Sequence, residues 1–210
     1  NLGYKDGVLK FFDTGGYHGV DEPSFDDNDI ISLPEGAEGQ LDEGYEKKDA
    51  DEVAQAMAQK LNITEPRYMG SGFFGAAYEI ADNKVLKITS DNSEAVENLK
   101  LIGQPLKYIA QPYRVFEIKS NTNPDFKKTY AIILEKLKTD TSYFKRMYKR
   151  LDYVFSSMFK TNIRNAVLSY IDGYGNDDDP IDRTQLDNYF KKNGKDGEFF
   201  FGLVRIAEEL

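Results

Sequence analysis

A short glycine-rich segment is the first part of the chain whose residue types could do chemistry. It fits the pattern G-x-G-x-x-G and reads Gly70-Ser71-Gly72-Phe73-Phe74-Gly75. Glycines at such positions let the backbone come close to a phosphate group, because a Cβ would hold it away. A dinucleotide site needs a helix after this segment, but residues 76–80 alternate as a strand does. We therefore expect a loop between two strands of a hairpin, with an ordinary glycine-rich turn as the alternative.

A lysine lies in the strand expected after this hairpin turn. Lys87 is surrounded by apolar neighbours in the run Val85-Leu86-Lys87-Ile88. A lysine buried in a strand is costly unless it meets an anion. The helix expected over residues 91–102 offers two carboxylates, because Glu94 and Glu97 are three residues apart and share a helix face. The alternative is that Lys87 lies on the solvated face of an edge strand.

The end of the last expected strand is the third feature. Its apolar residues 131–134 run into Glu135-Lys136-Leu137, and helices are expected from Thr141 onward. A glycine loop, a strand lysine, a helix carboxylate and this strand end follow one another in an order that resembles the N-terminal lobe (N-lobe) of the protein-kinase-like superfamily. The resemblance covers about residues 67–140, and the compact sequence is similar to the atypical kinase-like modules of phages and bacteria.

In that family the glycine loop covers the phosphates of ATP, the lysine contacts them, and the carboxylate orients the lysine. The resemblance therefore implies catalytic roles for Lys87 and Glu97. Glu97 is preferred because its distance to Tyr108-Ile109 suits the family pattern better, and Glu94 stays as the alternative. Leu134 would guard the back of the adenine pocket. The implied ATP-binding residues are Gly70, Ser71, Gly72, Phe74, Gly75, Lys87, Glu135 and Leu137.

The catalytic loop of the family is not found in the sequence. It requires a base aspartate in a His-Arg-Asp-type motif, a metal-binding asparagine and an Asp-Phe-Gly site. The single histidine, His18, lies far upstream of where that loop belongs. Residues 199–210 resemble the helix that precedes the catalytic loop, so we expect a fragment that stops before it. As given, the chain is expected not to transfer phosphate and to supply no metal ligands. ATP with Mg²⁺ is expected only with the missing downstream segment, as in an active phosphotransferase.

A second hypothesis is a non-catalytic structural or interaction protein, such as a phage virion component or pseudokinase that uses the fold as a scaffold. Its acidic leader, residues 1–48, would then dock on a protein partner. The net charge of −9 excludes general binding to a nucleic-acid backbone. No apolar run approaches the roughly 20 residues that span a bilayer, and no signal peptide is visible. We expect a cytoplasmic or virion-associated protein that is not secreted and does not bind membranes.

These elements predict an α+β fold. The strands are expected near residues 67–70, 76–80, 84–88, 113–118 and 128–134, as a five-stranded antiparallel sheet with one helix. Three regions follow: an extended acidic leader at 1–48, a kinase-like N-lobe with a preceding helix at 49–137, and a helical partial C-lobe at 138–210. The preceding helix is indicated by Val53, Met57 and Leu61, which recur every four residues.

Overall fold

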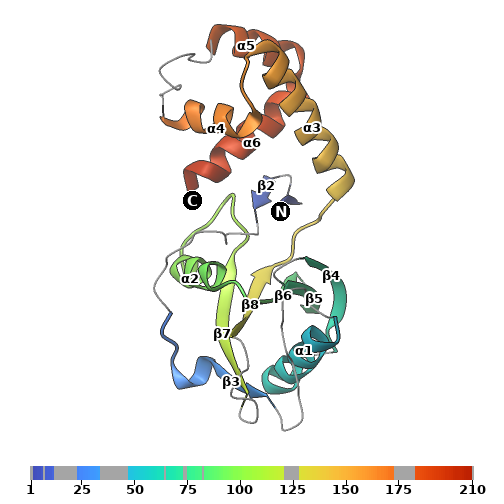
Figure 1. The fold of residues 1–210 in the computed structure, drawn as a ribbon, viewed down its shortest axis with the longest axis vertical. Coiled ribbons are helices and arrows are strands. Elements are labelled where there is room, and N and C mark those ends of the chain that lie inside the picture. Colours follow the sequence, from blue (N-terminus) through green and yellow to red (C-terminus); the bar gives the residue numbers. More distant parts are fainter. Residues whose placement is uncertain are drawn as a thin grey trace. The chain divides into compact units, whose positions relative to one another are not determined.

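The computed structural model of the chain describes residues 2–6, 8–11, 23–33, 47–63, 65–72, 75–81, 83–120, 128–172 and 183–209. The chain divides into two compact units (Figure 1). The sheet unit comprises Asp13–Pro105 and Ala110–Lys136. The helical unit comprises Asn1–Phe12, Leu106–Ile109 and Leu137–Leu210. The first residues of the expected leader thus belong to the helical unit.

The sheet unit is built on a six-stranded mixed sheet. Its strands are β3 (Ile30–Leu33), β4 (Arg67–Gly72), β5 (Gly75–Ala81), β6 (Lys84–Thr89), β7 (Pro112–Ser120) and β8 (Thr129–Glu135), in the spatial order β3-β7-β8-β6-β5-β4. The last five in the chain pair antiparallel, whereas β3 pairs parallel with β7. The predicted α+β class is confirmed. The five predicted strands are present and pair antiparallel, but the sheet is not the predicted five-stranded antiparallel one, because β3 adds a sixth strand in the parallel direction.

The extra strand comes from the segment that was expected to be an extended leader. Ile31 and Leu33 are buried, whereas Ser32 between them is exposed, so β3 alternates as a half-buried strand does. Its backbone pairs with the edge of β7, which would otherwise present unpaired N–H and C=O groups. Ile31 and Leu33, which belong to the leader that was expected to dock on a partner protein, therefore pack on the chain's own sheet.

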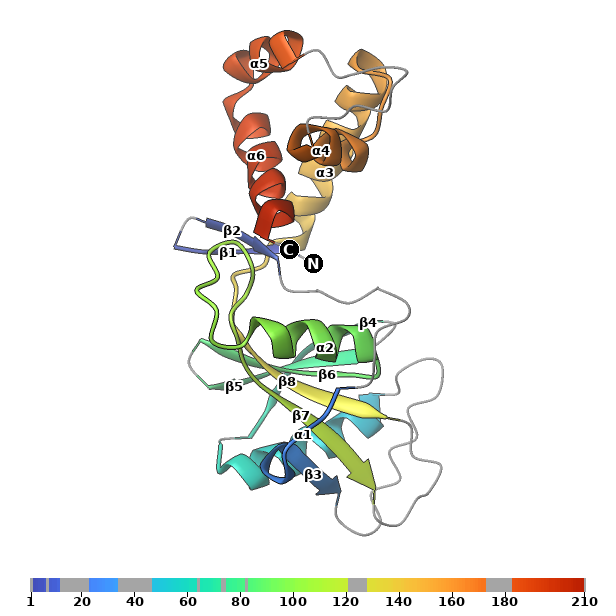
Figure 2. The same ribbon diagram turned by 90° about the vertical axis from the view of Figure 1, so that its left-hand side faces the viewer.

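Two helices cover opposite faces of the sheet, as Figure 2 shows. Helix α1 (Lys47–Leu61) packs Val53, Met57 and neighbouring alanines on the face that carries Tyr78 and Leu86. Helix α2 (Asn92–Leu101) packs Ala95 on the other face, against the cluster of Val115, Tyr130, Ile132 and Leu134. The α1 stripe read from the sequence is confirmed. A side chain on β6 thus faces α1 or α2 according to its register.

The helical unit consists of a hairpin and four helices. The hairpin joins β1 (Leu2–Lys5) and β2 (Val8–Phe11), and the helices are α3 (Thr141–Met158), α4 (Ile163–Asp172), α5 (Arg183–Lys192) and α6 (Gly194–Glu209). Phenylalanines dominate its core: the ring of Phe200 lies 5.1 Å from that of Phe155 and 5.2 Å from that of Phe190, between centroids. Leu9 of β2 is buried in the same cluster. Tyr4 exchanges two backbone hydrogen bonds with Lys138, which ties β1 to the segment before α3.

None of the helices in the described ranges combines the length and the apolar composition that crossing a bilayer requires.

Candidate functional site

An ion pair between a strand and a helix lies at the centre of the candidate site. The Lys87 ammonium donates a hydrogen bond to the Glu94 carboxylate, and the two side chains are only 16% and 2% exposed. Glu97, the residue preferred from the sequence, instead pairs on the surface with Lys100 at 2.8 Å. The choice of Glu97 is therefore wrong, and the alternative, Glu94, is the partner. Glu94 occupies the first turn of α2, where the helix dipole also favours a negative charge.

The beginning of α2 is held firmly, which positions Glu94. The Asp91 carboxylate accepts hydrogen bonds from the backbone N of Ser93 at 2.9 Å and from the Ser93 hydroxyl at 2.6 Å. The Asp91 backbone N donates to the Thr89 hydroxyl at 3.1 Å, so the cap is joined to the end of β6. The Tyr130 hydroxyl on β8 donates to Asn92 at 2.8 Å. These contacts fix the helix start relative to two strands of the sheet.

The floor beside Lys87 is made of very small residues. Gly70 is paired with Ala77, Ala77 with Lys87 and Lys87 with Ile132, so these four form one row across the sheet. Directly paired residues of antiparallel strands have their side chains on the same face. Because Ile132 packs with Ala95 of α2, this row lies on the α2 face. A Cβ added to Gly70 would have no atom within 4 Å, so space is open at the β4 end of this row, two strands from Lys87.

The other residues of the glycine-rich segment do not all lie on the Lys87 face of the sheet. Gly75 is required by packing alone, because a Cβ there would lie 2.0 Å from the backbone oxygen of Ile88. Ser71 is paired with Ala76, a residue of the α1 face, and its hydroxyl accepts a hydrogen bond from Tyr68 at 2.9 Å. The Ser71 side chain is thus on the face opposite Lys87. Gly72 is paired with Gly75, and Phe74 lies outside the described residues.

The end of β8 was expected to contact the adenine ring. Leu134 is buried and is paired with Val85, two residues before Lys87. Glu135 is buried as well, and its backbone N donates to Gln111 O at 2.9 Å. Leu137 is buried and belongs to the helical unit. Contacts of Glu135 and Leu137 with an adenine ring stay predictions.

A second polar cluster at this end of the sheet was missed from the sequence. Glu79 on β5 accepts hydrogen bonds from Arg67 and from Lys136. The hydrogen bonds from Arg67 and then Lys136 hold the pKa of Glu79 below its usual value. The only signal was the alternation of β5, which places Glu79 on the same face as Ala77 and Lys87. Ala77 itself was overlooked as a site residue, although its small size matters to the floor.

The Lys87 ammonium, oriented by Glu94, is suited to binding an anion. A lysine ammonium is a compact point charge with three donors, and one of them is used by Glu94. The hydrogen bond to the carboxylate fixes the direction of the ammonium, and the residues paired in the same row, Ala77 and Gly70, are small. Among the described residues there is no group of three His, Cys, Asp or Glu side chains that could hold a metal ion.

Comparisons with known proteins add no assignment. No protein-family model matches the chain, and a search of curated proteins finds no match either.

Proposed function

We propose that the sheet unit binds ATP through its phosphates, in the manner of the N-lobe of a protein-kinase-like domain. The observation that carries the proposal is the shielded Lys87–Glu94 pair beside the open row of Ala77 and Gly70. Lys87 would contact the phosphates, Glu94 would orient it, and Gly70 and Ala77 would let the ligand approach the sheet.

A purely structural role explains the ion pair poorly. Burying two opposite charges costs desolvation energy that their attraction often fails to offset, so apolar residues of the same size would serve stability as well. Lys87 is flanked by Leu86 and Ile88, which are fully buried on the α1 face. The chain thus keeps a charged pair at a position where an apolar side chain would pack. Binding of a phosphate group by the Lys87 ammonium would explain why a lysine occupies this position.

The chain order of the sheet unit also supports the proposal. Three strands, a helix and two strands follow one another from β4 to β8, which is the order on which the resemblance was based. The helix between β6 and β7 supplies the carboxylate that meets the lysine of β6. Strand β3 and helix α1 are additions to this order. They cover the edge at β7 and the face opposite the proposed site.

The proposal concerns binding and contains no phosphotransfer step. The described residues supply no metal cluster, so Mg²⁺ is taken to arrive with the nucleotide and no ligand in this chain is assigned to it. The scaffold hypothesis, with a virion or another assembly as partner, makes the opposite prediction for the same site. In a scaffold the pair would persist without nucleotide affinity.

Binding of a fluorescent ATP analogue with Mg²⁺ tests the proposal, using two matched pairs of variants. Lys87→Met should weaken binding at least tenfold, whereas Lys84→Met, which removes an exposed lysine from the same strand, should leave it unchanged. Glu94→Gln should weaken binding, and Glu97→Gln should not. If the unaltered chain binds no ATP, or if Lys87→Met and Lys84→Met bind it equally, the proposal is wrong and the scaffold hypothesis is favoured.

A further inference from the structure

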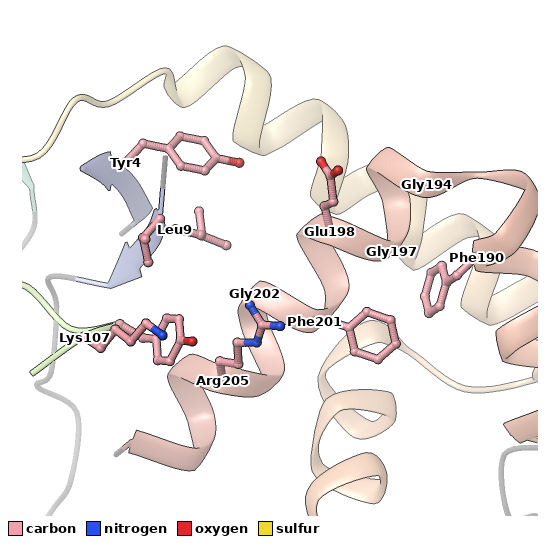
Figure 3. A pocket seen from close by; sticks show the side chains of 12 residues that line it. Tyr4, Leu9, Lys107, Phe190, Gly194, Gly197, Glu198, Phe201, Gly202 and Arg205 are labelled. Carbon is pink, nitrogen blue, oxygen red and sulfur yellow. The ribbon is translucent and has the colours of Figure 1, made fainter. Parts of the chain in front are cut away.

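The helical unit contains a cavity of about 550 Å³ that has no part in the proposed ATP site (Figure 3). Its walls come from the β1–β2 hairpin, from Leu106–Ile109, from Phe190 of α5 and from α6. The lining includes the aromatic side chains of Tyr4, Tyr108 and Phe201 and the apolar side chain of Leu9. The volume falls within the range of about 300–1,000 Å³ that is typical of small-molecule sites.

Hydrogen bonds connect three of the segments that form the walls of the cavity. The Glu209 carboxylate accepts hydrogen bonds from the backbone N of Lys107 at 2.7 Å and of Tyr108 at 2.5 Å, which fixes this segment to the end of α6. The backbone N of Phe11 donates to Tyr108 O at 2.8 Å, so β2 is fixed to the same segment. Three separate parts of the chain therefore meet at Tyr108.

Glycines of α6 form part of the cavity wall. A Cβ on Gly202 would lie 2.7 Å from a methyl carbon of Leu9, so the glycine lets β2 approach the helix. At Gly194 a Cβ would meet no atom within 4 Å, which leaves that end of the wall open. The α6 wall is thus packed closely against Leu9 at Gly202 and has free space at Gly194.

Two cations face one aromatic ring in this wall. The Lys107 ammonium lies 5.1 Å from the centroid of the Tyr108 ring, and the Arg205 guanidinium lies 5.8 Å from it. In the described part of the chain neither cation forms an ion pair. The nearby Glu209 carboxylate is occupied by backbone N–H groups. Two exposed cations without an ion pair among the described residues thus lie beside the cavity, in a chain whose net charge is −9.

The opposite rim carries a negative charge. Glu198 lines the cavity and is exposed, and Figure 3 shows its carboxylate apart from Arg205 and near the hydroxyl end of Tyr4. Burial first, and then the neighbouring Tyr143 and Glu198, raise the pKa of Tyr4, so its hydroxyl stays a neutral hydrogen-bond donor. The cavity therefore favours an anion at one end only.

We propose that this cavity binds a small aromatic anion whose charged group meets Lys107 and Arg205 and whose ring lies against Tyr108 and Phe201. The ligand class is an aromatic carboxylate, sulfonate or phosphate ester with one charged end and a neutral far end. The charged group gains two cations that form no ion pair with any described residue, and the ring gains the apolar wall. This site is independent of Lys87 and of the proposed binding of ATP.

The experiment uses the full 210-residue chain and the probe 8-anilinonaphthalene-1-sulfonate, an aromatic anion with one sulfonate. We expect saturable binding to the unaltered chain, followed by fluorescence. The double variant Lys107→Gln/Arg205→Gln should bind at least tenfold more weakly. The control Lys191→Gln/Lys192→Gln removes the same charge from exposed positions at the end of α5 and should bind like the unaltered chain.

Three further measurements distinguish recognition of the anion from general binding of an apolar dye. The neutral probe N-phenyl-1-naphthylamine has the same rings without the sulfonate, and its binding should not distinguish the two double variants. Tyr108→Leu removes the ring that faces both cations and should weaken the sulfonate probe at least threefold. Lys87→Met should bind this probe normally, so failure of the ATP proposal and failure of this one are distinguishable.

Either of two results would overturn the proposal. The first is equal affinity of the sulfonate probe for the Lys107→Gln/Arg205→Gln variant and its control, with circular dichroism showing both folded. The second is an equal loss of the neutral probe in the Lys107→Gln/Arg205→Gln variant, which would indicate damage to the apolar wall and no recognition of the anion.

Discussion

Replacing Glu94 by glutamine should destabilise the sheet unit strongly, because it leaves Lys87 shielded from water without its carboxylate. Breaking a buried ion pair by removing one partner costs about 3–5 kcal/mol. The Lys87 side chain retains 16% exposure and that of Glu94 only 2%, so the pair is not completely shielded from water. We therefore expect a cost of about 2–4 kcal/mol. The glutamine keeps the size of the side chain, so packing is little changed.

Glu97→Gln is the matched control on the same helix. Glu97 pairs with Lys100 at i,i+3, and the two side chains are 27% and 60% exposed. Such surface pairs contribute about 0.2–0.5 kcal/mol. The two substitutions are chemically identical, three residues apart, and differ in the surroundings of the carboxylate and in its distance from the helix start. Their effects should therefore differ several-fold.

Hydrogen exchange followed by mass spectrometry is the suitable assay, since it reports on peptides of one unit while the other unit stays folded. The peptide covering β6 and α2 should exchange about 30- to 700-fold faster in Glu94→Gln, because each 1.4 kcal/mol is a factor of ten. Glu97→Gln should change the rate by about twofold. The double variant Lys87→Met/Glu94→Gln should recover at least half of the loss, because it leaves no unpaired charge.

Two outcomes would refute this reasoning. Equal exchange rates in Glu94→Gln and Glu97→Gln would mean that the carboxylate of Glu94 has no special partner. A double variant whose loss equals the sum of the losses from Lys87→Met and Glu94→Gln would mean that the two side chains are not energetically coupled. Additive losses would refute the coupling of the two side chains even if Glu94→Gln alone proved strongly destabilising.

Three other predictions concern the supports of the site. Gly75→Ala should destabilise by about 2 kcal/mol or more in urea unfolding, because its Cβ would overlap the backbone of Ile88, whereas Gly70→Ala should change stability by less than about 0.5 kcal/mol. Asp91→Ala should cost about 1–2 kcal/mol through loss of the α2 cap, and exchange at the first α2 amides reports it. Burial first, and then the hydrogen bond to Asp51, raise the pKa of Tyr78. The folded state therefore keeps that proton above about pH 10, where the unfolded state loses it, and the corresponding stability disappears as the pH rises further. Tyr78→Phe should lose less unfolding free energy than the unaltered chain between pH 8 and pH 11.

Local patterns in the sequence predicted much of the sheet unit. The alternation after the glycine loop gave the strand that became β5, and the spacing of Val53 and Met57 gave α1. The apolar strand around Lys87 and the helix after it were also predicted, because each signal lies within a few neighbouring residues. These patterns were enough to bring Lys87 and an α2 carboxylate into one hypothesis.

Pairing between distant segments was not predictable in the same way. Strand β3 pairs Ile30 with Glu117, and its short apolar run is equally suited to a partner protein or to the chain's own sheet. The cavity of the helical unit needs residues 4 to 9, 107 to 108 and 190 to 205 to meet. No periodicity within one segment indicates such a meeting.

The sequence by itself determined that a lysine would lie in an apolar strand and that two glutamates would share the next helix. Only the tertiary structure decided that Glu94 is the partner, because the choice depends on how α2 is rotated about its axis and how far it lies along β6. The Asp91 cap and the contact of Tyr130 with Asn92 fix that placement through bonds between elements. A helical period describes which residues share a face, but packing against the sheet selects the side chain that turns inward.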